Sequence, residues 1–126
     1  YDIARLLVDL VYENVGCGKE EYVFANINRW VEVQKKLCDL SSAIDIGDRN
    51  LCNFINKCLE KTGKFFEGMD SKLRAFQPEE YSWDYQDHWR LLIINEILKK
   101  IGTISEISDL KRLSAYIASS ELLSEL

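Results

Sequence analysis

The segment PEEYSWDYQDHWRLLIINEILKKI, residues 78–101, contains the strongest helical pattern of the chain. Its large apolar residues recur at intervals of three and four, which is the spacing of one face of an α-helix. These residues are Tyr85, Trp89, Leu92, Ile93 and Ile97. Pro78 is the only proline, and it suits the first turn of a helix because that turn needs no backbone N–H donor. We therefore predict a helix over residues 78–101 that ends at Gly102.

Apolar residues with the same spacing continue on both sides of this segment. The helices that they predict span residues 2–15, 20–42, 48–61 and 64–76, with a last helix after residue 103. Gly63 and Gly68 weaken the pattern of the fourth helix and predict a kink or break. The sequence TISE at residues 103–106 has capping-box spacing, and Ser119 or Ser120 is expected to restart a short terminal helix.

The inward faces of these helices follow from the same spacing. In the first helix we expect Ile3, Leu6, Leu7, Leu10 and Val11 to face the core. In the second helix the expected set is Val23, Ile27, Trp30, Leu37 and Leu40, and in the last helix it is Ile107, Leu110, Leu113 and Ile117. The predicted fold class is all-α, a compact bundle of six to seven helices of unequal length.

Composition limits the classes of protein to consider. A chain of 126 residues is expected to form one domain, residues 1–126. Its net charge of −5 favours solubility and argues against nucleic acid as the main partner. No apolar run approaches the roughly 20 residues of a membrane helix, so we expect no membrane span. Nothing in the sequence indicates a cofactor, and we expect none.

The four cysteines decide which compartment we expect. Cys17, Cys38, Cys52 and Cys58 lack the close spacing of zinc or thioredoxin-type sites. Cys38 and Cys58 continue apolar stripes, so we interpret them as free core thiols of an intracellular, cytoplasmic protein. The even count leaves open two disulfides in a secreted protein. Because the chain starts without methionine, we expect either a domain cut from a longer protein or a processed mature chain.

Residues 78–89 form the most unusual segment because they combine four acids, two tyrosines, two tryptophans and the only histidine. One interpretation is structural: the acids complement the N-terminus of a helix and the aromatics anchor that helix to the core. The other is a recognition surface that binds a partner protein with a basic surface. Its contact residues are expected to be Tyr81, Trp83 and Tyr85, with Glu79, Glu80 and Asp84 around them.

The same segment contains a weaker metal-site pattern. Glu80, Asp84, Asp87 and His88 lie at positions i, i+4, i+7 and i+8, so one helical face could carry all four. Carboxylates with an imidazole suit manganese, iron or zinc. A single helix rarely completes a coordination shell, so we do not predict a metal here.

A basic patch is expected on the helix over residues 48–61 and just beyond it. Lys57, Lys61 and Lys64 share a face opposite Ile55 and Leu59, as a solvated helix face would. The alternative is a docking strip for an acidic partner, or for the acidic segment of a second copy of this chain. Self-association through these two patches would be sensitive to salt.

These patterns favour a non-enzymatic helical protein–protein interaction domain that acts as an adaptor or regulator. The alternatives are a secreted, disulfide-bonded helical factor or effector of the cytokine-like kind, and an enzyme with an acid/histidine metal site. If Trp83 is a contact residue, the substitution Trp83→Ala weakens partner binding and leaves the domain folded.

Overall fold

The computed structural model of the chain describes residues 2–14, 27–41, 44, 49–76, 79, 83–102 and 109–125. Within these ranges the chain forms helices and no strand, which confirms the predicted all-α class. The helices are α1 (Asp2–Asn14), α3 (Ile27–Lys36), α4 (Arg49–Phe76), α5 (Tyr85–Gly102) and α6 (Asp109–Ser124). The described residues thus form five helices, fewer than the six to seven that we predicted.

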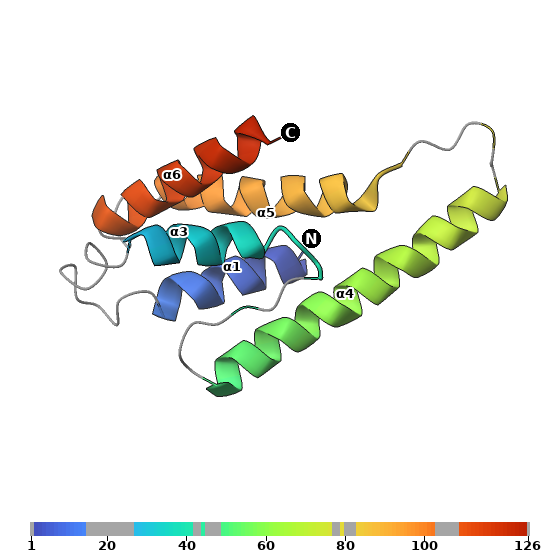
Figure 1. Cartoon of the computed structure of the whole chain (residues 1–126), viewed down its shortest axis with the longest axis horizontal. Helices are drawn as coiled ribbons and strands as arrows, with labels where there is room; N and C mark the ends of the chain where they lie inside the picture. Colours follow the sequence, from blue (N-terminus) through green and yellow to red (C-terminus); the bar gives the residue numbers. More distant parts are fainter. Residues whose placement is uncertain are drawn as a thin grey trace.

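Helices α1, α3, α5 and α6 pack together, and α4 runs along one side of this group at an angle (Figure 1). Helix α6 packs against α5 and α3, and α5 packs against α1 (Figure 1). Helix α4 contacts α5, and its C-terminal end projects past the other helices (Figure 1). In the described part of the chain, no helix combines the length and the apolar character that a bilayer span requires.

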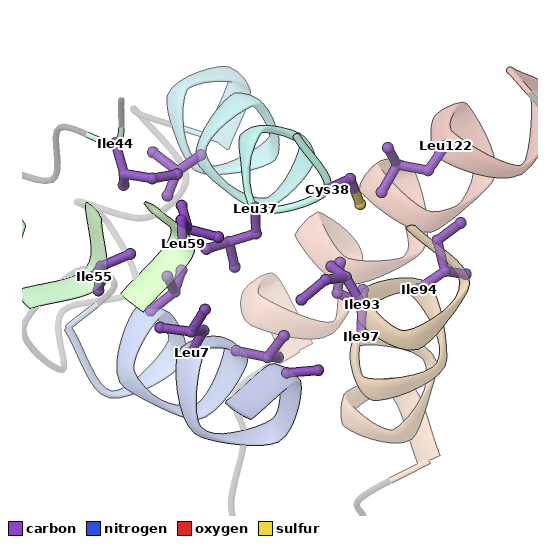
Figure 2. Packing of buried hydrophobic residues seen from close by; sticks show 14 of the residues in the cluster. Leu7, Leu37, Cys38, Ile44, Ile55, Leu59, Ile93, Ile94, Ile97 and Leu122 are labelled. Carbon is purple, nitrogen blue, oxygen red and sulfur yellow. The ribbon is translucent and has the colours of Figure 1, made fainter. Parts of the chain in front are cut away.

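The hydrophobic core includes residues of all five helices. Figure 2 shows Ile55 and Leu59 of α4 pointing toward Leu7 of α1 and toward Leu37 and Ile44. Two of the three indole rings, those of Trp30 and Trp89, are almost completely buried. The largest fully buried side chains also include Leu7, Leu37, Ile55, Leu59, Ile93, Ile97 and Leu122. Most of α4's contribution to this core therefore comes from its N-terminal half.

Helix α3 ends at Lys36, so the prediction of a helix as far as residue 42 is wrong. The side chain of Asp39 accepts hydrogen bonds from the backbone N–H of Ser41 at 2.9 Å and from its hydroxyl at 2.7 Å. This local bonding competes with the helix. The indole Nε1 of Trp89 donates to the carbonyl of Leu37 at 2.7 Å, which satisfies an acceptor that the helix leaves free.

Helix α4 is continuous for 28 residues, which corrects the predicted break between residues 61 and 64. Each glycine costs about 1 kcal/mol relative to alanine in a helix. Burial of side chains such as Ile55 and Leu59 is worth roughly 1.5–3 kcal/mol each, so the packing outweighs that cost. Gly63 also lies close to Leu40, since a Cβ at Gly63 would stand 3.6 Å from the Leu40 Cβ.

The predicted inward faces are confirmed for Leu7, Leu10 and Val11 of α1 and are wrong for other residues of α1 and α6. Ile3 and Leu6 are 38% and 41% exposed, whereas Ala4, Leu7, Val8 and Val11 are buried. In α6, Leu113 is 44% exposed, and small residues occupy the inward face. These are Ser114, Ala115, Ala118 and Ser119. Small side chains let α6 approach both α3 and α5 closely. Ile107 and Leu110 lie outside the residues whose side chains are described.

Helix α6 also continues through Ser119 and Ser120, so the predicted restart there is wrong. The hydroxyl of Ser119 donates to the carbonyl of Tyr116 at 3.1 Å, within the helix. The hydroxyl of Ser114 donates to the carbonyl of Lys111 at 2.8 Å in the same manner. A serine whose hydroxyl is satisfied by the preceding turn can remain in a helix interior.

A buried polar contact joins α1, α3 and α6. The hydroxyl of Tyr12 donates to the side-chain oxygen of Gln34. The Gln34 amide donates to the hydroxyl of Ser114 at 3.2 Å and to the carbonyl of Trp30 at 3.2 Å. Burial raises the pKa of Tyr12 well above its ordinary value, so the phenol is neutral. Because satisfied polar groups in a core need specific partners, this contact sets the register of the three helices.

Candidate interaction surface

A stripe of mainly apolar side chains runs along the whole of α4 with alternating intervals of three and four residues. Its members are Cys52, Ile55, Leu59, Phe66, Met69, Leu73 and Phe76, with Thr62 at the remaining position. This spacing keeps the side chains on one side of a helix, as in the seam between two packed helices. The stripe therefore marks the side of α4 that is suited to helix packing.

The two ends of this stripe have opposite environments. Ile55 and Leu59 are completely buried in the core. Met69, Leu73 and Phe76 are 39%, 41% and 81% exposed, and the neighbouring Phe65 is 65% exposed. We call Phe65, Met69, Leu73 and Phe76 the α4 face. Single exposed apolar residues are ordinary, but several on one side of one helix form a patch of the kind that binds partners.

The lengths of the helices explain why the α4 face is uncovered. At 1.5 Å per residue, α4 is about 42 Å long, whereas α5, its packing partner, is about 27 Å long. The other helices of the described chain are shorter still. The end of α4 therefore extends past the bundle, as Figure 1 shows.

A cluster of aromatic rings marks the boundary between the buried and exposed parts of α4. The ring of Phe66 lies 5.9 Å from Trp83, 6.2 Å from Tyr85 and 6.3 Å from Trp89, between ring centroids. The ring of His88 lies 6.0 Å from Phe66. Aromatic pairs at these separations contribute about 0.5–1.5 kcal/mol each beyond the area that they bury. We call these five residues the Phe66 cluster, and it holds α4 against the start of α5.

The segment before α5 differs from the prediction. Helix α5 begins at Tyr85, and Asp84 is its N-cap, because the Asp84 carboxylate accepts the backbone N–H groups of Gln86 at 3.0 Å and Asp87 at 3.3 Å. The predicted helix start at Pro78 is therefore wrong. An aspartate with two backbone donors is a stronger start signal than a proline that merely tolerates the first turn.

The predicted partner-binding residues have three different placements. Trp83 and Tyr85 are half-buried in the Phe66 cluster, and their rings lie 6.1 Å apart. Glu79 and Asp84 are exposed. Tyr81 and Glu80 lie outside the described residues. The structure thus brings two of the three predicted aromatics next to the α4 face, although sequence reasoning did not identify that face as a surface.

The predicted basic patch lies on α4 itself. Lys57, Lys61 and Lys64 are all exposed, and Lys64 forms an ion pair with Glu60 at 3.2 Å. An exposed pair of this kind contributes little to stability. The patch therefore occupies a solvated side of the same helix that carries the α4 face.

The residues of the weak metal pattern do not share one helical face. Asp84 caps α5 from outside the helix, and its carboxylate is engaged by backbone donors. Asp87 lies 3.9 Å from Arg90, and the His88 ring packs on Phe66 and Trp83. Glu80 lies outside the described residues. In the described ranges, no three histidine, cysteine or acidic side chains are grouped closely enough to hold a metal ion.

A cavity of about 220 Å³ lies between α3, α5 and α6. It is lined by Lys35, Lys36, Cys38, Asp39, Arg90, Leu122 and Glu125. Its charges are largely paired, since the Lys35 ammonium lies 3.1 Å from Glu121 and 3.6 Å from Glu125. Burial raises the pKa of the Cys38 thiol to about 12, so this thiol is neutral and a poor nucleophile.

Three of the four cysteines are described, and all three are free thiols. Cys38 and Cys52 are buried and Cys58 is half-buried, as the apolar-stripe interpretation predicts. Cys17 lies outside the described residues.

Comparison with protein-family models, with curated proteins and with solved structures finds no match for this chain. The functional interpretation therefore rests on the geometry of the α4 face and of the Phe66 cluster beside it.

Proposed function

We propose that this chain is a non-enzymatic helical interaction domain, an adaptor or regulator, that binds another protein through the α4 face. One observation carries the proposal. The stripe of α4 packs into the core over its first half and continues, with the same spacing, onto an exposed surface formed by Phe65, Met69, Leu73 and Phe76. A surface with the pattern of a packing seam and no packing partner is typical of a protein-binding site.

The size of the α4 face suits a reversible complex. Complete burial of one large apolar side chain is worth roughly 1.5–3 kcal/mol, and these four are already partly covered. A partner that covered them would gain several kcal/mol before association costs, and contacts around the edge add to this. That range corresponds to a transient complex, as expected of an adaptor or regulator.

The Phe66 cluster supports the same function by fixing the position of α4. A surface that is ordered before binding loses less conformational entropy when a partner arrives. Trp83 and Tyr85, which we proposed as contact residues from the sequence, lie against Phe66 and remain partly exposed. We propose that they form the margin of the site and hold α4 in place.

We further propose an intracellular location. Free thiols at Cys38, Cys52 and Cys58 support it, because small secreted proteins usually pair their cysteines. The secreted alternative would require disulfide bonds among these cysteines.

The test compares three tagged versions of the full chain expressed in the same cells. Leu73→Glu places a charge in the centre of the α4 face, and Ser71→Glu places the same charge on an exposed residue on the opposite side of α4. We expect the wild type and Ser71→Glu to capture the same proteins by proximity labelling. We expect Leu73→Glu to reduce that labelling at least about tenfold, because a buried unpaired charge costs several kcal/mol.

Circular dichroism of all three proteins provides the control. Leu73 is outside the core, so Leu73→Glu should retain the helix content and melting temperature of the wild type. Identical labelling by Leu73→Glu and Ser71→Glu would show that the α4 face is not the binding surface.

A further inference from the structure

The charges on α4 differ from those of the rest of the chain. Helix α4 has six basic and three acidic residues, a net charge of +3. The whole chain has a net charge of −5, which leaves −8 for the remaining residues. The helix that presents the exposed apolar surface is therefore the basic part of an otherwise acidic protein.

Two lysines form one edge of the α4 face. Lys61 lies one turn before Phe65, and Lys72 lies two turns after it on the same side of the helix. Both are exposed, and neither has an ion-pair partner among the described residues. On the opposite edge, Asp70 is paired with Arg74 at 3.2 Å, so its negative charge is compensated. The edge charge that remains available to a partner is positive.

The shape of the surface indicates what fits it. The α4 face is one helix wide, and the rise from Phe65 to Phe76 is about 16 Å. A second helix with apolar residues at positions i, i+3 or i+4 and i+7 would pack on such a stripe along three turns. The N-terminal half of the stripe already packs in this manner against the bundle, and its continuation is exposed at Met69, Leu73 and Phe76.

We infer that the α4 face binds an acidic amphipathic helix of a partner protein, with carboxylates that pair with Lys61 and Lys72. This inference rests on the proposed function and adds the chemistry of the partner. It differs from the basic partner expected from the acidic residues 79–87, because the α4 face lies on the basic helix instead.

Charge disfavours the two other occupants. A second copy bound through the same face would bring one +3 helix against another, with lysines near lysines. An anionic membrane would suit a basic apolar helix taken alone. A flat bilayer must also approach the acidic bundle beside α4, whereas a helix about 10 Å wide contacts only the projecting end. Screening over about 8 Å at physiological salt separates that end from the rest of the protein.

The experiment uses two fluorescein-labelled helical peptides of about 21 residues. Both carry leucine at the seam positions, and the flanking positions are glutamate in one and lysine in the other. Fluorescence anisotropy measures their binding to the full chain. We expect the glutamate peptide to bind and the lysine peptide to bind at least about tenfold more weakly, with the difference decreasing as salt increases.

Charge-reversed variants sharpen this test. Lys61→Glu combined with Lys72→Glu should weaken the binding of the glutamate peptide at least about tenfold. The same double variant should allow the lysine peptide to bind. The matched control is Lys57→Glu combined with Lys64→Glu, which makes the same charge change on two lysines of the basic patch that lie farther round the helix from the stripe than Lys61 does. We expect the control to change binding by less than about threefold, because those charges act only through screened water.

The outcomes separate this inference from the proposed function. If both peptides bind equally and Leu73→Glu abolishes this binding, the inference of an acidic partner is wrong. The α4 face would still be the interaction surface. Binding of anionic phospholipid vesicles that Leu73→Glu abolishes would identify a membrane as the occupant. A dimer in sedimentation velocity that Leu73→Glu dissociates would identify a second copy. Failure of both peptides, together with unchanged proximity labelling in Leu73→Glu, would overturn the inference and the proposed function together.

Discussion

Leu59 and Leu73 lie on the same side of the same helix, separated by 14 residues or about four turns. Leu59 is completely buried, whereas Leu73 is 41% exposed. Neither residue type nor spacing distinguishes them. The difference arises from what lies opposite. Leu59 meets Leu7 and Leu37 of the bundle (Figure 2), whereas Leu73 belongs to the C-terminal part of α4, the end that projects past the bundle (Figure 1). Helical spacing thus defines a face, and the neighbouring elements decide whether that face belongs to the core or to a surface.

The largest expected effect is the contrast between two identical substitutions. Leu59→Ala should lower the free energy of unfolding by about 2–5 kcal/mol, because it leaves a cavity in the core. Leu73→Ala should change it by less than about 0.5 kcal/mol, because it removes only partly exposed surface. Urea denaturation followed by circular dichroism measures both values.

Both alanine variants have the same helix propensity, so each is the control for the other. Equal destabilisation by the two substitutions would show that the end of α4 is packed as firmly as its beginning. In that case the contrast between the two halves would be wrong, and the α4 face would be part of the core.

The boundary between the two halves is tested by Trp83→Ala. This substitution removes a ring that packs on Phe66 at 5.9 Å, so we expect a loss of about 1–2 kcal/mol. Hydrogen exchange should become faster in residues 66–76 and remain unchanged near Ile55, because only the far half of α4 depends on the Phe66 cluster. The domain should remain folded and bind its partner more weakly.

Leu91→Ala is the matched control, since Leu91 is 51% exposed on α5 and belongs to no aromatic contact of the described chain. It should leave exchange in residues 66–76 unchanged. If Trp83→Ala instead accelerates exchange throughout the protein, Trp83 supports the core and not the α4 face.

The sequence predicts helices better than their ends. The first helix was predicted at residues 2–15 and observed at Asp2–Asn14, because an apolar stripe followed by Gly16 and Gly18 in the sequence is a local signal. At the end of α3, the Asp39–Ser41 hydrogen bonds are local, but Trp89 also donates to the carbonyl of Leu37, a contact between residues 52 positions apart. No local pattern contains the second contact. Aspartate at position 84 is also a local cap signal, but the predicted helix start rested on Pro78 alone.

Burial was harder to predict than helicity for the same reason. The spacing of Phe65, Met69, Leu73 and Phe76 was visible in the sequence, but their exposure depends on where α5 and its neighbours end. The inward face of α6 consists mainly of small residues, with Leu122 near its end, and hydrophobicity alone favoured Leu113 over Ala115. Gln34 is buried because Tyr12 and Ser114 supply its hydrogen bonds from other helices. The site proposed at Trp83 and Tyr85 lies beside the surface now proposed, since both depend on the contact with Phe66.

The smallest expected effect comes from the glycine in the exposed half of α4. A Cβ at Gly68 would have no heavy atom within 4 Å, so Gly68→Ala gains helix propensity of up to about 1 kcal/mol without a clash. Because the end of α4 extends past the bundle, we expect it to open before the core does. The added helix stability should therefore slow hydrogen exchange in residues 69–76 about fivefold. The melting temperature of the domain should remain nearly unchanged.

Gly63→Ala provides the comparison at the boundary, where the new Cβ would stand 3.6 Å from the Cβ of Leu40. That separation is an ordinary contact, and the substitution acts on the half of α4 that unfolds with the core. We expect the gain in helix propensity from Gly63→Ala to raise the melting temperature by a few degrees, because about 1 kcal/mol of added stability has this effect in a domain of this size. If Gly68→Ala raises the melting temperature equally, α4 unfolds as one unit with the bundle. The two halves would then differ in exposure alone, and the α4 face would be as rigid as the core that supports it.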